Sequence, residues 1–276
     1  MNRWMTTLMV FALCSAVVGA DVTVVQTTTI EGGMAAMGAG APSPTTTTRI
    51  KGQKRRDDVE VPSVMQLATI TDLAAKQIVV LRPDQKTATV VTPTASAAGT
   101  GAPAGTVPPK APDVDASIKP TGKSQVIDGI TCDEYAFTSS VNMSEMGGTS
   151  PEVSSMMKDM KMNMVGSMWV AKDVPGAAEY IAFQKAAAAS NLGGAMAAAA
   201  GMKMPGMEKM TQAMASMNGM TYLTEMSMTV EGTGQMADMM RQMGPMKITT
   251  KVTSVKTDTI ADDQFTVPAD YKVVKQ

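Results

Sequence analysis

The first part of the chain alternates apolar or β-branched residues with polar ones, which is the pattern of half-buried strands. The alternation covers residues 22–30, 45–61, 64–72 and 76–91. Within the last of these, Arg82-Pro83-Asp84-Gln85 places proline at the second position of a turn between two β-rich runs. The pattern therefore predicts consecutive hairpins, and consecutive hairpins form an antiparallel meander.

Strand character returns after residue 124. Residues 124–141 contain the turn signal Asp128-Gly129 between two β-rich runs, which predicts a hairpin. Residues 166–174 predict one further strand, and residues 222–232 and 247–260 predict two more that alternate clearly. We therefore expect eight or more strands in an antiparallel sheet.

Helices are predicted where methionine recurs at helical spacing. Such runs are Met207, Met210, Met214 and Met217; Met156, Met160 and Met164; and, more weakly, Met236, Met239, Met240 and Met243. An alanine-rich helix is predicted over residues 179–192, ending at Gly193-Gly194. These helices would each present an apolar face to the sheet.

Two segments have the composition of loops. Residues 32–44 are rich in glycine and alanine, and residues 92–124 are dominated by proline, alanine, glycine, threonine and serine. Such segments bury too little apolar surface to stay ordered. We expect both to be disordered insertions in a single domain that spans residues 21–276.

Residues 1–20 have the features of a secretory signal peptide. Arg3 precedes an apolar run, and Val18-Gly19-Ala20 offers a small-residue cleavage site before Asp21. The apolar run is too short to span a bilayer, which needs roughly 18 to 20 residues. We therefore expect cleavage after Ala20, a periplasmic or secreted location, and no transmembrane anchor after cleavage.

Composition narrows the function classes. The 24 basic and 25 acidic residues nearly cancel, and basic residues are not interleaved with aromatic ones, so no nucleic-acid partner is expected. Histidine is absent, which removes the commonest general base and the imidazole ligands of metal sites. Only Cys132 would remain after cleavage, and we expect it to be buried and inert. The composition predicts a protein that is not an enzyme and has no cofactor.

Two short motifs and the order of the elements carry a family resemblance. Residues 129–135 have the pattern Gly-Ile-x-Cys-x-x-Tyr, and residues 265–271 have the pattern Phe-x-x-Pro-x-x-Tyr, where x is any residue. Over about residues 22–274 the chain resembles a family of exported bacterial domains of unknown function, related to the LolA-like periplasmic lipoprotein carriers. The resemblance implies a half-barrel whose concave face is covered by helices and holds acyl chains.

The expected fold class is therefore α+β, a curved antiparallel β-sheet of the LolA-like half-barrel type covered by Met-rich amphipathic helices. Met residues concentrate in one region, with 23 of the 29 falling from Met143 to Met246. They could fill the contact between helices and sheet, line a plastic apolar cavity, bind Cu(I) through thioethers, or act as an oxidant sink.

From these readings we predict an exported, non-enzymatic protein that binds a hydrophobic ligand, such as a lipid, under a Met-rich helical lid. Two alternatives stay open: a periplasmic Cu(I)-binding Met-rich protein, and a Met-packed structural domain without a specific ligand. The residues predicted to line the ligand site are Met156, Met160, Met164, Met207, Met210, Met214, Met217 and Trp169.

Overall fold

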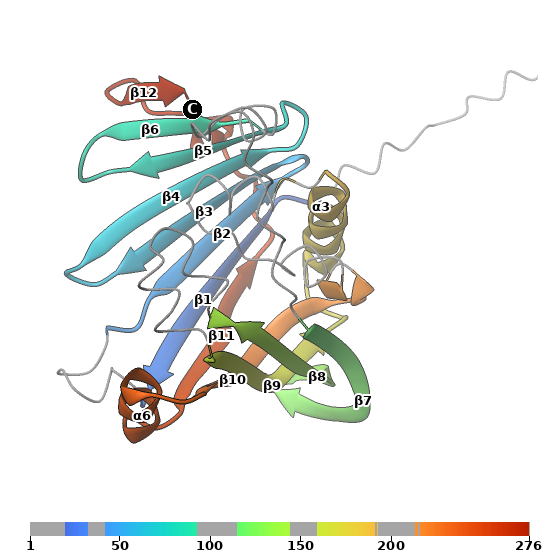
Figure 1. Ribbon diagram of the computed structural model, residues 1–276. Helices are drawn as coiled ribbons and strands as arrows, with labels where there is room; N and C mark the ends of the chain where they lie inside the picture. Colours follow the sequence, from blue (N-terminus) through green and yellow to red (C-terminus); the bar gives the residue numbers. More distant parts are fainter. Residues whose placement is uncertain are drawn as a thin grey trace, which may run out of the picture.

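The computed structural model describes residues 20–32, 42–92, 115–143, 159–190, 192, 213–214 and 216–275 (Figure 1). Within these residues the protein is mostly β, with one open sheet of twelve strands and two short helices. The strands are β1 Val22–Glu31, β2 Thr45–Lys51, β3 Lys54–Val61, β4 Met65–Asp72, β5 Gln77–Arg82, β6 Thr87–Val91, β7 Asp115–Ile127, β8 Ile130–Asn142, β9 Lys161–Ala171, β10 Met220–Glu231, β11 Met246–Lys256 and β12 Lys272–Lys275. The helices are α3 Ala177–Ala189 and α6 Gln235–Gln242, and a 3-10 turn, η3, spans Asp262–Phe265.

The sheet order is β12-β6-β5-β4-β3-β2-β1-β11-β10-β9-β8-β7. Strands β1 to β6 form the predicted meander, and we call them the first wing. Strands β7 to β10 form a second meander, the second wing, and β11 joins the two by pairing with β1 and β10. All pairings are antiparallel except that of β12, which runs parallel to β6 at one edge.

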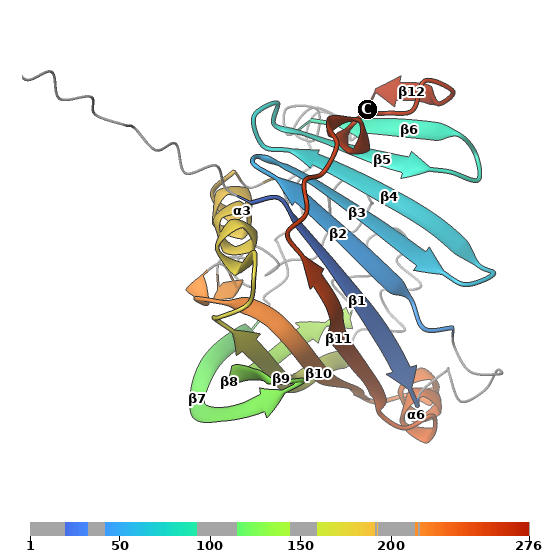
Figure 2. The same cartoon turned by 180° about the vertical axis from the view of Figure 1, so that it is seen from behind.

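The two wings are steeply inclined to each other, as both views show (Figures 1 and 2). Two register shifts lie near the bend, one between Val25 and Gln26 in β1 and one between Thr221 and Leu223 in β10. A bulge adds a residue to one strand, which bends that strand and increases its twist. Irregularities of this kind favour a bend in the strands that join the wings.

The predicted hairpin connections are confirmed. Asp128 and Gly129 link β7 to β8 with positive φ angles of 50° and 81°, the signs that a type I′ turn requires. Between β5 and β6, the Gln85 N–H donates a hydrogen bond of 3.2 Å to the Arg82 carbonyl. Both turns follow directly from residues that favour them.

Three groups of buried side chains hold the sheet. In the first wing, the C-terminal segment covers aliphatic strand residues; this cluster is Ala68, Ile70, Val79, Leu81, Ala88, Ile260 and Phe265. Helix α3 packs on the junction of the wings; this cluster is Val22, Val24, Ile50, Cys132, Trp169, Ala171, Val174, Ala177, Phe183, Met220, Tyr222 and Val252. The third cluster lies on the second wing and is rich in methionine.

The helical content differs from the α+β prediction. Helix α3 confirms the predicted alanine-rich helix, but it contains no methionine and ends at Ala189, before the glycine pair. Helix α6 confirms the weaker methionine run near residue 240. In the described ranges, neither helix is long and apolar enough to cross a membrane. The described residues therefore form a sheet with two short helices, of which only α6 contains methionine, and not a sheet covered by several Met-rich helices.

The helix predicted around Met156, Met160 and Met164 is wrong in its described part. Strand β9 begins at Lys161 and carries Met164 between two hydrogen-bonded neighbours, β8 and β10. Long-range pairing on both sides decides the conformation here, because tertiary contacts override local helical spacing. Met156 lies outside the described residues.

The loop predicted over residues 92–124 is wrong at its C-terminal end, because β7 begins at Asp115. This strand is the edge of the sheet, and its register shifts between Pro120 and Ser124. An edge strand tolerates proline and glycine because one side of its backbone needs no ladder partner. Residues 1–19, 33–41 and 93–114 lie outside the described residues.

Candidate functional site

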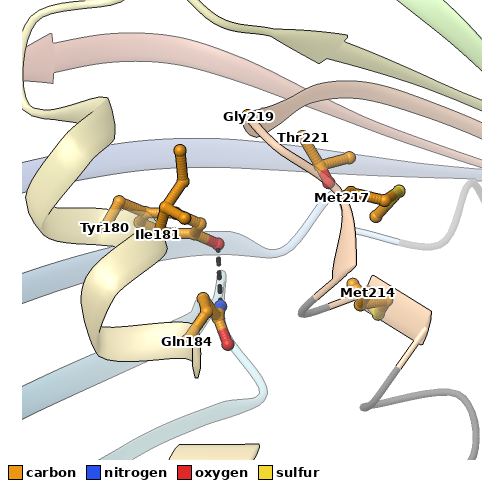
Figure 3. Close-up of a pocket in the computed structure, with 7 residues that line it drawn as sticks. All are labelled: Tyr180, Ile181, Gln184, Met214, Met217, Gly219 and Thr221. Atoms are coloured by element: carbon orange, nitrogen blue, oxygen red, sulfur yellow. Dashed lines mark hydrogen bonds between the residues drawn. The ribbon is translucent and has the colours of Figure 1, made fainter. Parts of the chain in front are cut away.

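A small cleft lies between helix α3 and the segment that leads into β10 (Figure 3). Its walls are mostly apolar, and the Gln184 side-chain amide donates a hydrogen bond of 3.2 Å to the Tyr180 hydroxyl at the helix side. The space within the cleft is about 20 Å³, which suits one or two water molecules. The lining residues are Tyr180, Ile181, Gln184, Met214, Met217, Gly219 and Thr221.

Two glycines allow the walls of this cleft to approach the sheet. Gly176 precedes α3 with a φ of 76°, and a Cβ added there would lie 2.5 Å from Val22 Cγ2. Gly219 precedes β10, and a Cβ there would lie 2.4 Å from Val170 Cγ1. Side chains at these positions would push the helix and the β10 segment away from the strands.

The methionine-rich cluster of the second wing is a set of packed apolar side chains, which we call the methionine face. Successive side chains of a strand point to opposite faces, so the even-numbered methionines of β9 share a side. Met228 and Met226 of β10 lie directly opposite Met164 and Gly166 of β9. The methionine face consists of Met162, Met164, Met168, Met217, Met226 and Met228, packed with Phe137, Val141 and Val170.

Met217 connects the cleft to the methionine face. It lines the cleft, is only 5% exposed, and belongs to the same packed cluster as Val170 and Met168. An apolar molecule that displaced the Met217 side chain from the cleft would therefore meet further methionine side chains. The cleft is in this sense one end of a longer apolar surface.

Gly166 interrupts the side chains of the methionine face. A Cβ at this position would lie 2.1 Å from the Glu225 carbonyl oxygen, so the backbones of β9 and β10 approach too closely for any side chain. Phe137 and Met226 are its cross-strand neighbours. The face is therefore lower at Gly166 than at the residues around it.

An ion pair in the first wing lies next to the cleft. The Arg55 guanidinium donates to both carboxylate oxygens of Asp57, at 2.7 and 2.8 Å, and the Thr48 hydroxyl donates to the same carboxylate at 2.6 Å. Burial acts to lower the pKa of Arg55, but Asp57 and the cleft residue Tyr180 outweigh it, so the pKa is raised. The charge of Arg55 is matched locally, so this pair offers no free cation to an anionic group.

Cys132 is buried, as expected from the sequence. Burial, and then the carboxylates of Asp133 and Asp128, raise the pKa of its thiol. The thiol therefore stays protonated near neutral pH, and a protonated thiol is a poor nucleophile and a poor metal ligand.

The predicted ligand-lining residues fall into three groups. Met164 and Met217 share the methionine face, and Met217 and Met214 line the cleft. Met160 is buried beside Gly232, and Trp169 packs in the α3 cluster, where its indole N–H has no hydrogen-bond partner. The remaining three, Met156, Met207 and Met210, lie outside the described residues.

Sequence reasoning missed four methionines of the face: Met162, Met168, Met226 and Met228. The signal that could have found Met162, Met226 and Met228 is the period-two alternation of residues 160–164 and 226–228, which read MKMNM and MSM. Met168 lies in the strand predicted over residues 166–174. In the described part of the chain, His, Cys, Asp and Glu side chains form no group of three or more that could hold a metal ion.

Comparison with known proteins gives only distant likenesses. No protein-family model and no curated protein sequence matches the chain. A structure of PNGF-II in space group C2 is 9% identical with a TM-score of 0.37, covering 93% of this chain but 31% of that one. The structure of LprF from Mycobacterium bovis is 10% identical with a TM-score of 0.25, covering 91% of this chain and 90% of that one. Likenesses this weak carry neither a fold assignment nor a function to this chain.

Proposed function

We propose that this protein is an exported, non-enzymatic binder of a hydrophobic ligand, such as a lipid. The observation that supports this most directly is the methionine face, which Met217 links to the cleft beside α3. The leader-like residues 1–20 support export, and the absence of histidine supports a role without catalysis. The LolA-like motifs noted in the sequence point the same way.

Methionine side chains suit a site that binds an apolar ligand. Its unbranched side chain has three rotatable bonds and a polarisable sulfur, so it repacks around different shapes at low cost. Each CH₂ group moved from water onto such a surface gains about 0.8 kcal/mol before binding costs are subtracted. An acyl chain is therefore long enough to bind using only these contacts.

The space in the cleft is only about 20 Å³, so binding of an acyl chain requires a wall to move. Helix α3 is the movable wall, because only Ala177 and Phe183 are fully buried, whereas its other packed side chains are partly exposed: Tyr180, Ile181 and Ala187. A helix held by so few buried side chains can shift at a small free-energy cost. On this proposal, displacement of α3 and of the Met217 side chain admits the ligand to the methionine face.

The test is a pair of tryptophan variants on α3. Gln184 lines the cleft, whereas its neighbour Lys185 is exposed and is not among the lining residues. With a fluorescent fatty acid as the probe, Gln184→Trp should weaken binding by about tenfold or more, since the indole fills the entrance. Lys185→Trp should leave the affinity within about twofold of the parent.

Two outcomes would contradict the proposal. One is that the parent protein binds no fluorescent fatty acid, and native mass spectrometry of the protein from its own periplasm finds no apolar ligand. The other is that both variants bind the probe as the parent does. The first outcome would favour a Met-packed structural domain, and the second would place the ligand away from the cleft.

A further inference from the structure

Three methionines stand in a row across adjacent strands of the sheet. Met164 of β9 lies directly opposite Met228 of β10, and Met228 lies directly opposite Met246 of β11. Residues directly opposite each other in a ladder point to the same face. The three thioether side chains therefore leave the sheet side by side, although they come from three separate parts of the sequence.

The spacing of the row suits a single small ion. Neighbouring strands lie about 4.8 Å apart, so the outer two side chains start about 4.8 Å on either side of Met228. A methionine sulfur is two bonds beyond Cβ and can lean toward its neighbour by rotation about χ1 and χ2. Leaning of this kind by Met164 and Met246 brings all three sulfurs within reach of one ion above Met228.

The row is partly accessible. Met164 is 8% exposed, whereas Met228 and Met246 are half-buried. The chain between β10 and β11 forms α6, which packs on β10 and carries the half-buried residues Met240 and Met243 nearby in sequence. An ion can therefore reach the row from solvent without unfolding of the sheet.

We propose that Met164, Met228 and Met246 form a binding site for a soft monovalent cation, Cu(I), for which Ag(I) is the redox-stable probe. Thioether sulfur is a neutral, soft ligand that selects Cu(I) over the hard and borderline cations. No histidine competes for the ion, and Cys132 belongs to a different packed cluster. Thioether ligands are uncharged, so the complex with three of them has the same single positive charge as the free ion.

This row shares Met164 and Met228 with the methionine face, but it lies away from the cleft through which the apolar ligand is proposed to enter. The cleft lies at the Val170 end of β9, where Gly219 and Met217 approach the strand. Met164 is six residues away along β9, which is about 20 Å at 3.3 Å per residue. A substitution at the cleft entrance therefore leaves the three methionines of the row unchanged.

The experiment uses Met228→Leu, the centre of the row, and Met226→Leu as its matched control. Met226 is on the same strand and the same face, but its cross-strand neighbour on β9 is Gly166 and that on β11 is Ile248. Each leucine variant keeps the side-chain volume nearly unchanged, so both should fold like the parent. Chemical denaturation of all three proteins checks that they do.

Ag(I) is titrated into each protein in chloride-free buffer, with the methionine methyl groups labelled with carbon-13 for NMR. The methyl signals of Met164, Met228 and Met246 should shift together on adding one Ag(I). Met228→Leu should lower the affinity for this Ag(I) ion by about tenfold or more, and Met226→Leu should lower it by no more than about twofold. Signals are assigned by single substitution, so Ag(I) bound by other methionines is recognised separately.

The proposal is overturned if the three methyl signals do not move, or if they move equally in the Met228→Leu variant. Equal losses in the two leucine variants would also overturn it, because they would indicate diffuse binding by the whole methionine face. Met228→Leu removes one thioether from the row but keeps an apolar side chain on the methionine face, so it separates metal binding from apolar contact. Conversely, Gln184→Trp should leave Ag(I) binding unchanged, so the failure of either proposal can be identified.

Discussion

The two wings of the sheet are built from the same kind of strand but are packed with different side chains. In the first wing, β1 to β6 contain one methionine, Met65, and it is 51% exposed. The buried positions there are mainly aliphatic, as at Ile70, Val79 and Leu81, with Thr48 as a buried polar residue. In the second wing, the corresponding positions of β9 and β10 are mainly methionine.

The difference separates a stiff region from an adaptable one. Branched side chains have few rotamers and fit one arrangement of neighbours, which fixes the first wing and the C-terminal segment packed on it. Methionine fits many arrangements and retains some freedom when it is buried. Any ligand site, apolar or metallic, is therefore expected in the second wing, and the first wing serves as its support.

The largest expected effect compares alanine substitutions in the two wings. Leu81→Ala, at a residue that is 1% exposed, should lower the free energy of unfolding by about 3 to 5 kcal/mol, since the rigid neighbours cannot close the cavity. Met168→Ala should cost about 2 kcal/mol, because the surrounding methionines move into the space. Urea denaturation of both variants measures the difference.

Equal losses in the two variants, or a larger loss for Met168→Ala, would show that the methionine face is as rigid as the first wing. The slope of the free energy against urea concentration serves as the control. It should be unchanged in both variants, since a change would indicate an altered denatured state rather than an altered core.

Much of the sheet could be predicted from the sequence because strands and tight turns are encoded locally. The alternation of residues 22–30 matches β1, that of residues 247–260 matches β11 as far as Lys256, and Asp128-Gly129 forms the turn that its residue types favour. The pairing of β1 with β11 could not be predicted in this way. Nothing local in either strand specifies a partner more than two hundred residues away.

The methionine spacing misled the prediction for an identifiable reason. Met160 and Met164 are four residues apart, and a spacing of four fits one face of a helix and also one face of a strand. Met162, which lies between them, distinguishes the two, because it shares their face only in a strand. The row of Met164, Met228 and Met246 depends on register between distant strands, so no pattern within one segment reveals it.

The second prediction tests the close approach of β9 and β10 beneath the methionine face. Gly166→Ala places a Cβ 2.1 Å from the Glu225 carbonyl oxygen, so the two backbones must move apart. The expected cost is about 1 to 3 kcal/mol of unfolding free energy, which exceeds the small gain that alanine brings in the unfolded state.

Thermal or chemical denaturation measures this cost, with Ser167→Ala as the control, since residue 167 points to the opposite face of β9. If Gly166→Ala were as stable as the parent, the backbone of the second wing would be able to adapt as its side chains do. That result would extend the comparison between the wings from packing to the strands themselves.

The smallest expected effect is a pH dependence at the far edge of the first wing. The Lys86 ammonium lies 2.9 Å from the Asp270 carboxylate and, by hydrogen bonding to it, holds the pKa of Asp270 below its ordinary value. A carboxylate whose pKa is lowered by folding stabilises the folded state above its unfolded pKa, about 3.9, and this contribution is lost as the pH falls through the folded value. Both side chains are more than half exposed, so the effect is local and screened by salt.

The measurement is amide exchange at Lys272, whose N–H donates 2.8 Å to the Lys86 carbonyl and begins the pairing of β12 with β6. After correction for intrinsic rates, protection should fall as the pH is lowered from about 5 to about 3. Asp270→Asn should remove this dependence, whereas Asp262→Asn, which breaks the separate Lys51 pair, should retain it. A parent protein whose Lys272 protection does not change over this range would show that backbone pairing alone holds β12, and that the ion pair at this edge contributes nothing measurable.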